Sequence, residues 1–323
     1  MPETSRRNVV VHRLQPGHPH ERLAAGATLV LDAVDELYGP LGGFAQDLER
    51  FTRTGVQINA YASWTPVEGF GVHWDDHDTV IVQLDGSKRR RLYGSTRTAP
   101  LHRDVAVPEP PPDTPITDLV LTAGDVLYVP RGWWHAVTAD QGHPSLHITA
   151  GLQTRTGADL LAWIADNLRR DADFRRDLPV HAIPAEQIAH VERLGKLVLA
   201  EFTDPDLFGA YAASRDALYP GRMRPSLPHI GDVPADGTLA VRLTTARSHL
   251  RTDPVTDTTV LTANGKEFAF AAATEPMLRP LAEGRGATPA ELAARADLGI
   301  ADAAAVVTVL VAGQAATIAG SPT

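Results

Sequence analysis

The chain has 323 residues, a formal net charge of -9 and no cysteine. Its length is sufficient for two or three domains with buried cores. The absence of cysteine excludes disulfides, thiolate metal sites and cysteine nucleophiles. With 39 acidic against 30 basic side chains, the charge balance argues against a nucleic acid as a direct ligand.

The hydropathy of the chain predicts no contact with a membrane. No apolar run approaches the roughly 20 residues that a membrane-spanning helix requires. The polar start, MPETSRRNVV, lacks the apolar centre of a signal peptide. We therefore expect a cytoplasmic protein.

Residues 1 to about 55 predict an entry segment that covers a sheet. Within it, residues 24–37 favour one or two short helices that lead to a break at Gly39-Pro40. The proline-rich stretch 100–115 predicts a surface loop, because each proline removes a hydrogen-bond donor from a strand.

Between residues 56 and 152 the pattern predicts strands. Short alternating or apolar runs are separated by turn residues, and they are residues 56–61, 79–84, 125–129 and 145–150. Many short strands at this spacing are typical of a sandwich or a small barrel.

After residue 154 the periodicity becomes helical. Apolar residues recur at helix spacing over residues 160–168 and again over residues 188–198. The two amphipathic helices predict a bundle-like insert or a dimerisation surface.

From about residue 231 strand and helix patterns alternate, at residues 239–243, 258–261, 276–282 and 289–298. The last of these begins with Thr288 as N-cap, Pro289 at the first helical position and Glu291 at the third. The valine-rich run 303–316 is compatible with a strand, a helix or both. Such a mixture fits a winged-helix-like domain.

The clearest chemical signal lies in the segment GFGVHWDDHD, residues 69–78. On an extended backbone His73 and Asp75 project to the same face, so an imidazole and a carboxylate can share one metal ion. A second segment, residues 124–135, predicts a strand and a Pro/Gly turn that delivers His135 as a third ligand. Two histidines and one carboxylate form the facial triad that favours non-haem Fe(II).

How specific these motifs are depends on their combination. An isolated H-x-D is most often incidental, and it becomes a metal-site motif here only because the segment G-D-x4-P-x-G-x2-H accompanies it. Together the two segments resemble the JmjC-type cupin oxygenases, and within them the ribosomal-oxygenase branch of 2-oxoglutarate-dependent protein hydroxylases. The resemblance is strongest over residues 59–151.

This resemblance implies the architecture and the cofactors. It implies a mainly β catalytic domain over residues 1–153, a double-stranded β-helix of the jelly-roll or cupin type. A helical dimerisation region would follow over residues 154–230, and a winged-helix-like α+β domain over residues 231–323. Fe(II), 2-oxoglutarate and O2 would be used, with His73, Asp75 and His135 as the catalytic metal ligands.

The resemblance also assigns residues to the cosubstrate. Lys88 occupies the place of the basic residue that pairs with the far carboxylate of 2-oxoglutarate. Strand alternation turns Lys88 and Arg90 to one face of their strand. The alternative is that Lys88 belongs to a solvated basic run. The family often has an aromatic residue where Arg90 stands and a small hydroxyl residue near Gly151, so the pocket walls are expected to differ.

Three further residues match positions of the family's pocket. Asn59 and Tyr61 share one face of the strand before H-x-D, and His147 lies on a later strand. Packing in the core is the alternative for Tyr61, and a hydrogen-bonded interior position is the alternative for His147.

The implied function is hydroxylation of an Arg or His side chain in a protein or peptide substrate, including a ribosomal protein, by a homodimeric enzyme. A hydroxylase of a peptide natural-product precursor is the nearest alternative. A non-oxidative metal cupin would use the same ligands but would not need Lys88 to face the metal. A non-catalytic binding module would not need the triad at all.

Overall fold

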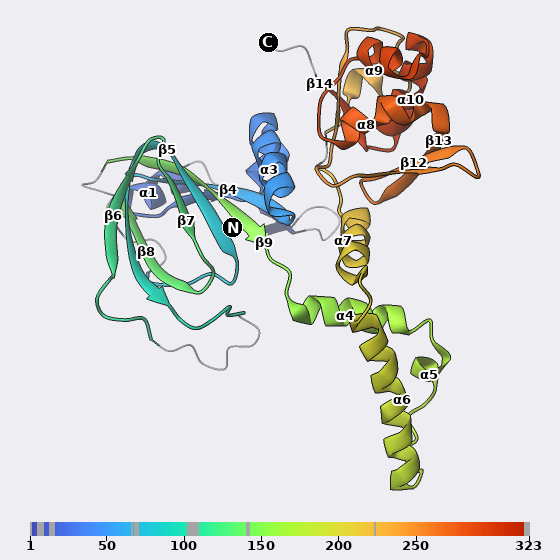
Figure 1. The fold of residues 1–323 in the computed structure, drawn as a ribbon. Helices are drawn as coiled ribbons and strands as arrows, with labels where there is room; N and C mark the ends of the chain where they lie inside the picture. The colour runs from blue at the N-terminus through green and yellow to red at the C-terminus, as the bar shows by residue number, and fades with distance from the viewer. Residues whose placement is uncertain are drawn as a thin grey trace. The chain divides into compact units, whose positions relative to one another are not determined.

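The computed structural model describes residues 2–4, 10–12, 17–65, 67, 71–101, 110–139, 143–222 and 224–319. The chain folds as two compact units, Met1–Thr154 and Arg155–Thr323. Figure 1 shows the change from strands to helices along the chain. The three-part division into residues 1–153, 154–230 and 231–323 stays a prediction.

The first unit is mainly β, as predicted. Its elements are β1 (Pro2–Thr4), β2 (Val10–His12), α1 (Gly17–Ala24), β3 (Leu29–Leu31), α2 (Val34–Leu37), α3 (Gly39–Thr52), β4 (Gly55–Ser63), β5 (Asp78–Ser95), β6 (Thr117–Thr122), β7 (Val126–Val129), β8 (Trp133–Ala139) and β9 (Ser145–Gln153). The four strand runs predicted between residues 56 and 152 all coincide with strands of this unit. Part of the predicted proline-rich loop lies outside the described residues, and residues 110–116 form no strand.

The long strand β5 organises the sheet. Strands β3, β4, β9, β5 and β6 pair in this order, and β7 and β8 also pair with β5, all antiparallel. The first half of β5 pairs with β7 and β9, and its second half pairs with β6 and β8. In Figure 1 the strands consequently curve around a common interior.

Side chains of β5 alternate between the interior and the surface. The buried face carries Thr79, Ile81 and Gln83 in its first half, and Lys88, Arg90 and Leu92 in its second half. A strand that buries one face normally fills that face with apolar side chains. The inward-facing cations therefore mark the second half of β5 as part of a site.

Gly86 lies where β5 passes from one set of partners to the other. Its φ is +65°, and a β-carbon at this position would lie 1.8 Å from the carbonyl oxygen of Pro144. Only glycine accommodates both the left-handed backbone and this close approach.

The entry segment covers the sheet, but its boundaries differ from the prediction. The predicted short helix before the Gly39-Pro40 break is α2, which ends at Leu37 and is followed by the extended Tyr38. The Gly39-Pro40 pair then begins helix α3, because proline is tolerated in a first helical turn. The Asp35 Oδ1 atom accepts a hydrogen bond from the backbone N–H of Ile58 at 2.9 Å. Glu49 Oε1 accepts one from Val56 at 3.1 Å, so both helices are tied to β4.

The second unit consists of helices followed by small sheets. Its elements are α4 (Gly157–Leu168), α5 (Ala172–Arg175), α6 (Pro184–Phe202), α7 (Leu207–Leu218), η2 (Leu227–His229), β10 (Ala240–Leu243), β11 (His249–Asp253), β12 (Thr258–Ala263), β13 (Lys266–Ala271), η3 (Ala272–Thr274), α8 (Glu275–Ala282), α9 (Pro289–Ala296), α10 (Ile300–Ala312) and β14 (Ala316–Ala319). None of the helices in the described ranges is both long enough and apolar enough to cross a bilayer.

The two predicted amphipathic helices are confirmed as α4 and α6. Thr156 caps α4 through a reciprocal pair of hydrogen bonds with Asp159. The buried apolar cluster of this helical region consists of Leu160, Ile164, Leu168 and Leu207.

The last part of the chain has a core of its own. Strands β10 and β14 form one small sheet, strands β11, β12 and β13 form another, and α8, α9 and α10 pack with them. Thr288 and Glu291 form the predicted capping box. The undecided valine-rich run is helical to Ala312, because its buried residues Ala303, Val307, Leu310 and Val311 recur at helix spacing.

Candidate metal centre

Backbone pairing brings the two sequence motifs together. His73 and His135 form an isolated antiparallel bridge, with N–H···O distances of 3.0 and 2.8 Å. The backbone N–H of Gly132 donates to the carbonyl of Asp75 at 2.8 Å. Gly132 has a φ of +77°, and a β-carbon there would lie 2.2 Å from Pro100. The H-x-D loop is thereby joined to the turn that precedes His135.

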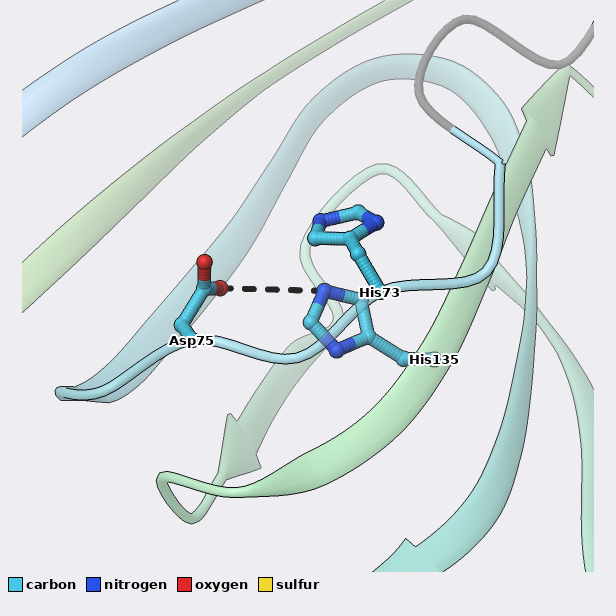
Figure 2. A group of neighbouring side chains, drawn as sticks. All are labelled: His73, Asp75 and His135. Carbon is cyan, nitrogen blue, oxygen red and sulfur yellow. Dashed lines mark ion pairs between the residues drawn. The ribbon is translucent and has the colours of Figure 1, made fainter. Parts of the chain in front are cut away.

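The three predicted ligands converge on one point. One ligand atom from each of His73, Asp75 and His135 lies within 4.8 Å of the others. Asp75 Oδ2 is 3.7 Å from His135 Nε2, and the two imidazole centroids are 4.3 Å apart. Figure 2 shows His73 and Asp75 on the loop before β5, facing His135 on β8.

Backbone carbonyls orient both imidazole rings. His73 Nδ1 lies 3.0 Å from the carbonyl oxygen of Gly71, and His135 Nδ1 lies 2.9 Å from that of Trp133. A carbonyl oxygen only accepts hydrogen bonds, so each Nδ1 carries the proton. In this tautomer the Nε2 atom of each ring carries the lone pair that can bind a metal.

The donor set fits a divalent first-row metal. Two imidazoles and one carboxylate, without thiolate, match the facial triad of non-haem Fe(II) sites. Burial lowers the pKa of His135, which keeps its imidazole neutral and able to bind a metal. Among the described residues this is the one group of acidic and histidine side chains close enough to hold an ion.

A cavity of about 280 Å³ opens beside the triad. Its wall contains all three ligands together with Lys88 and Arg90. The other lining residues are Thr28, Tyr61, Thr79, Ile81, Val137, His147 and Thr149. The structure therefore places Lys88, Tyr61 and His147, three of the four predicted cofactor residues, around the same cavity as the metal ligands.

Lys88 is a buried cation of this cavity. Its side chain is 4% exposed, and its Nζ donates to Ser63 Oγ at 2.6 Å. Burial lowers the pKa of Lys88 to about 8. Its neighbours Arg89 and Arg91 turn outward instead and lie 2.9 and 3.6 Å from Asp118. The solvated basic run thus describes Arg89 and Arg91 but not Lys88.

Tyr61 and His147 form a stacked pair in the cavity wall. Their ring centroids are 5.0 Å apart and their planes differ by 6°. Burial, with help from the charges of Arg90 and Lys88, lowers the pKa of His147 to about 2. Burial raises the pKa of Tyr61. Both rings are therefore neutral at physiological pH.

Asn59, the fourth predicted cofactor residue, lies outside the lining of the cavity. Its Oδ1 accepts hydrogen bonds from the backbone N–H of Ala33 and from Gln57 Nε2, both at 3.0 Å. Its side chain is also hydrogen-bonded to Tyr61. Asn59 therefore contacts the site through Tyr61.

Some residues of the site were absent from the prediction. Ser63 follows Tyr61 by two positions, and Thr149 follows His147 by two, so the same strand alternation extended by one step identifies them. The contact with His77 explains the glycine at position 151, because a β-carbon there would lie 3.0 Å from the ring of His77. No local signal marks Thr28, which precedes β3.

Known proteins resemble part of this chain in sequence. The family model described as the JmjC domain matches residues 42–160. The bifunctional lysine-specific demethylase and histidyl-hydroxylase NO66 of Drosophila persimilis is 30% identical over 154 residues, which are 46% of this chain and 22% of that protein. Ribosomal oxygenase 1 of Gallus gallus is 30% identical over 160 residues, which are 43% of this chain and 27% of that protein.

The fold is also found among solved structures. The Escherichia coli ribosomal oxygenase YcfD, in complex with cobalt and 2-oxoglutarate, superposes with a TM-score of 0.59 at 18% identity. The superposition covers 99% of this chain and 95% of that one. At this identity the likeness concerns the fold alone.

Residues 42–160 match the JmjC domain model, and the fold is a cupin-like β-sheet domain followed by a helical region and small C-terminal sheets. The chain is related to the ribosomal oxygenases and histidyl-hydroxylases. The chain spans about a quarter of the length of the curated relatives it matches.

Proposed function

We propose that the protein is an Fe(II)- and 2-oxoglutarate-dependent oxygenase that hydroxylates a side chain of a protein or peptide. The observation that carries this proposal is the shared cavity. It joins a His-Asp-His group to the buried ammonium of Lys88. A non-oxidative metal cupin has use for the three ligands, but it does not require a buried cation facing them.

Different residues of the chain would bind the metal and the cosubstrate. His73, Asp75 and His135 would hold Fe(II), with the imidazoles fixed by the carbonyls of Gly71 and Trp133. When iron, 2-oxoglutarate and dioxygen are bound together, oxidative decarboxylation of the cosubstrate to succinate and carbon dioxide supplies the oxidising power for hydroxylation.

The protein contributes binding and positioning. Ser63 fixes the Lys88 ammonium, whose charge pairs with a carboxylate inside the cavity, where water screens it little. The neutral rings of Tyr61 and His147 form a wall without adding charge. Holding both reactants in place is the main catalytic contribution that such a site makes.

The substrate that we propose is an Arg or His side chain of a protein, with a ribosomal protein as the first candidate. The support comes from the names of the relatives, a histidyl-hydroxylase and a ribosomal oxygenase. The net charge of -9 also suits a basic protein substrate. A precursor of a peptide natural product is the other substrate class to be tested.

We further propose that the protein is a homodimer that pairs through α6. This helix has 19 residues, of which only His190 is buried. Ile188, Val191, Leu199 and Phe202 are exposed, and their spacing places them along one stripe. Gly195 lies in the same stripe, with no atom within 4 Å of where its β-carbon would be, so a second helix can approach closely.

The winged-helix-like assignment of residues 231–323 stays part of this proposal. Its support is the common core that three helices share with the small sheets. No nucleic-acid role is attached to it, because the net charge of the chain is -9.

An anaerobic titration of the full chain with Fe(II) and 2-oxoglutarate tests the proposed chemistry. The visible charge-transfer band of the iron chelate is expected in the wild type. It should be absent in His135→Ala, and Lys88→Ala should need much more 2-oxoglutarate. Asp76→Asn is a matched control, because Asp76 contacts His77 and is not a triad member.

No band in iron-loaded wild type would contradict the oxygenase and favour the non-oxidative cupin or the binding module. If the band forms, ribosomal proteins and candidate precursor peptides are incubated with the complete system. Mass spectrometry then identifies the peptide that gains one oxygen and the residue that carries it.

A further inference from the structure

Arg90 is a second buried cation of the cavity, and two of its three guanidinium nitrogens have no hydrogen-bond partner among the described residues. The side chain is 4% exposed and lines the cavity beside the triad. Its Nε and Nη2 atoms are fully buried, and neither has a hydrogen-bond partner among the described residues. Lys88 differs, because its Nζ donates to Ser63.

Such an arrangement is costly in the ligand-free protein. Two buried guanidinium nitrogens that lack partners lose their hydration without compensation. Burial lowers the pKa of Arg90 only to about 10, so the group stays charged at neutral pH. Native structures rarely leave buried donors unpaired, and an anion in the cavity would satisfy them.

The shape of the free donors indicates which anion fits. Nε–H and Nη2–H lie on one edge of the guanidinium plane and point in nearly the same direction. That edge matches the two oxygens of a single carboxylate in a bidentate contact. An ammonium such as that of Lys88 acts as a point charge and does not impose this geometry.

The strand register locates Arg90 between the metal ligands and Lys88. On the ladder between β5 and β8, Leu92 pairs with His135, Arg90 with Val137 and Lys88 with Ala139. Arg90 therefore stands two residues along β5 from the level of His135, roughly 7 Å, and Lys88 stands twice as far. A ligand that reaches from the metal ligands towards Lys88 has to pass Arg90.

The charges of the cavity lead to the same ligand class. Asp75 is the one acidic residue among the described lining residues, and it belongs to the metal triad. Two cations then face the cavity without a carboxylate from the protein. A dicarboxylate that uses one carboxylate at the metal brings its second carboxylate to these cations.

We propose that Arg90 is a specificity residue for the cosubstrate. Its Nε and Nη2 atoms donate hydrogen bonds to the carboxylate that is not at the metal, and the Lys88 ammonium lies beside the same carboxylate. This inference rests on the proposed function and extends it. The cavity is thereby selective for 2-oxo acids with a second carboxylate over 2-oxo acids with one.

Calorimetric titration of the Mn(II)-loaded full chain separates the two kinds of ligand. The probes are 2-oxoglutarate, which has two carboxylates, and 2-oxobutyrate, which has one. In Arg90→Met, affinity for 2-oxoglutarate should fall about tenfold or more, the usual scale for a charged hydrogen bond. Affinity for 2-oxobutyrate should stay within about twofold of the wild type, because only the second carboxylate contacts Arg90. Arg91→Met is the matched control, since Arg91 lies on the outward face and pairs with Asp118.

Thermal unfolding distinguishes a ligand contact from a structural one. Replacing an unpartnered buried charge by Met should leave the ligand-free melting temperature unchanged or raise it. The increase in melting temperature that 2-oxoglutarate gives the Mn(II)-loaded wild type should shrink in Arg90→Met. If Arg90→Met fails to fold, Arg90→Lys carries the test; it keeps the charge without the bidentate edge, and it should weaken 2-oxoglutarate binding selectively.

Each negative outcome has a separate meaning. If the Mn(II)-loaded wild type does not bind 2-oxoglutarate, the proposed function fails. If the wild type binds it and Arg90→Met binds it equally well, the role of Arg90 is refuted while the function stands. Equal losses for both 2-oxo acids would also refute the role, because Arg90 would then not act on the second carboxylate.

Discussion

At the scale of single residues, the site combines groups whose charge is fixed with one whose charge depends on pH. Backbone carbonyls orient the imidazoles of His73 and His135. The path of the main chain therefore decides which ring nitrogen of each histidine can bind a metal. His147 stays neutral because it is buried beside two cations. Lys88 is the exception, because burial lowers its pKa to about 8, close to physiological pH.

The affinity for 2-oxoglutarate should therefore weaken above pH 8. The ammonium form of Lys88 attracts the cosubstrate carboxylate and the neutral amine does not, so affinity falls as pH rises through the pKa of Lys88. The groups facing Lys88 are Arg90, His147 and Ser63. His147 stays neutral and the Ser63 hydroxyl does not titrate, while Arg90, with a pKa of about 10, keeps most of its charge up to pH 9. Calorimetry at both pH values measures the loss.

Lys88→Arg provides the control for this pH dependence. A guanidinium keeps its charge over the whole range, so the variant should bind with nearly constant affinity from pH 7 to pH 9. An equal pH dependence in wild type and Lys88→Arg would show that Lys88 is not the titrating group.

At the scale of the elements, β5 connects the sheet to the site. Its first half packs Ile81 into an apolar cluster with Leu92, Leu121 and Val129. Its second half presents Lys88 and Arg90 to the cavity. The passage between the halves depends on Gly86, where the chain takes a conformation that other residues rarely adopt.

Substitution of Gly86 by Ala should destabilise the first unit. The left-handed φ and the contact with Pro144 together should lower the free energy of unfolding by more than about 1 kcal/mol. Chemical denaturation followed by tryptophan fluorescence measures the change. Gly43→Ala is the control: Gly43 lies inside α3 with no atom within 4 Å of its β-carbon position, so this change should be neutral or stabilising. Equal stability of Gly86→Ala and wild type would refute the argument.

At the scale of the whole molecule, the proposed homodimer depends on the exposed apolar stripe of α6. Val191 and Leu199 are more than half exposed within it. Apolar stripes on a helix are stable in water when a partner covers them.

Val191→Asp combined with Leu199→Asp should convert the proposed dimer to a monomer in light scattering coupled to gel filtration. Two charges in the stripe would be buried without partners if the copies still associated. Ala200→Asp, an exposed position of the same helix outside the stripe, should remain dimeric. A monomeric wild type, or a double variant that remains dimeric, would contradict pairing through α6.

The sequence by itself determined the features that depend on local periodicity and on motif chemistry. Alternation along β5 placed Lys88 and Arg90 on one face, and helix spacing located α4 and α6. The spacing of H-x-D, together with the turn before His135, identified the three residues that the structure brings within 4.8 Å of one another.

Only the tertiary structure decided what depends on residues distant in the sequence. The oxygen of Asn59 is used by the backbone of Ala33, which keeps Asn59 out of the cavity lining. The helical state of residues 303–312 follows from burial of one face in the C-terminal core. That Nε and Nη2 of Arg90 lack a partner among the described residues is likewise visible only in the folded chain. Burial and pairing are set by every element that surrounds a side chain, whereas a sequence pattern reports only its own strand or helix.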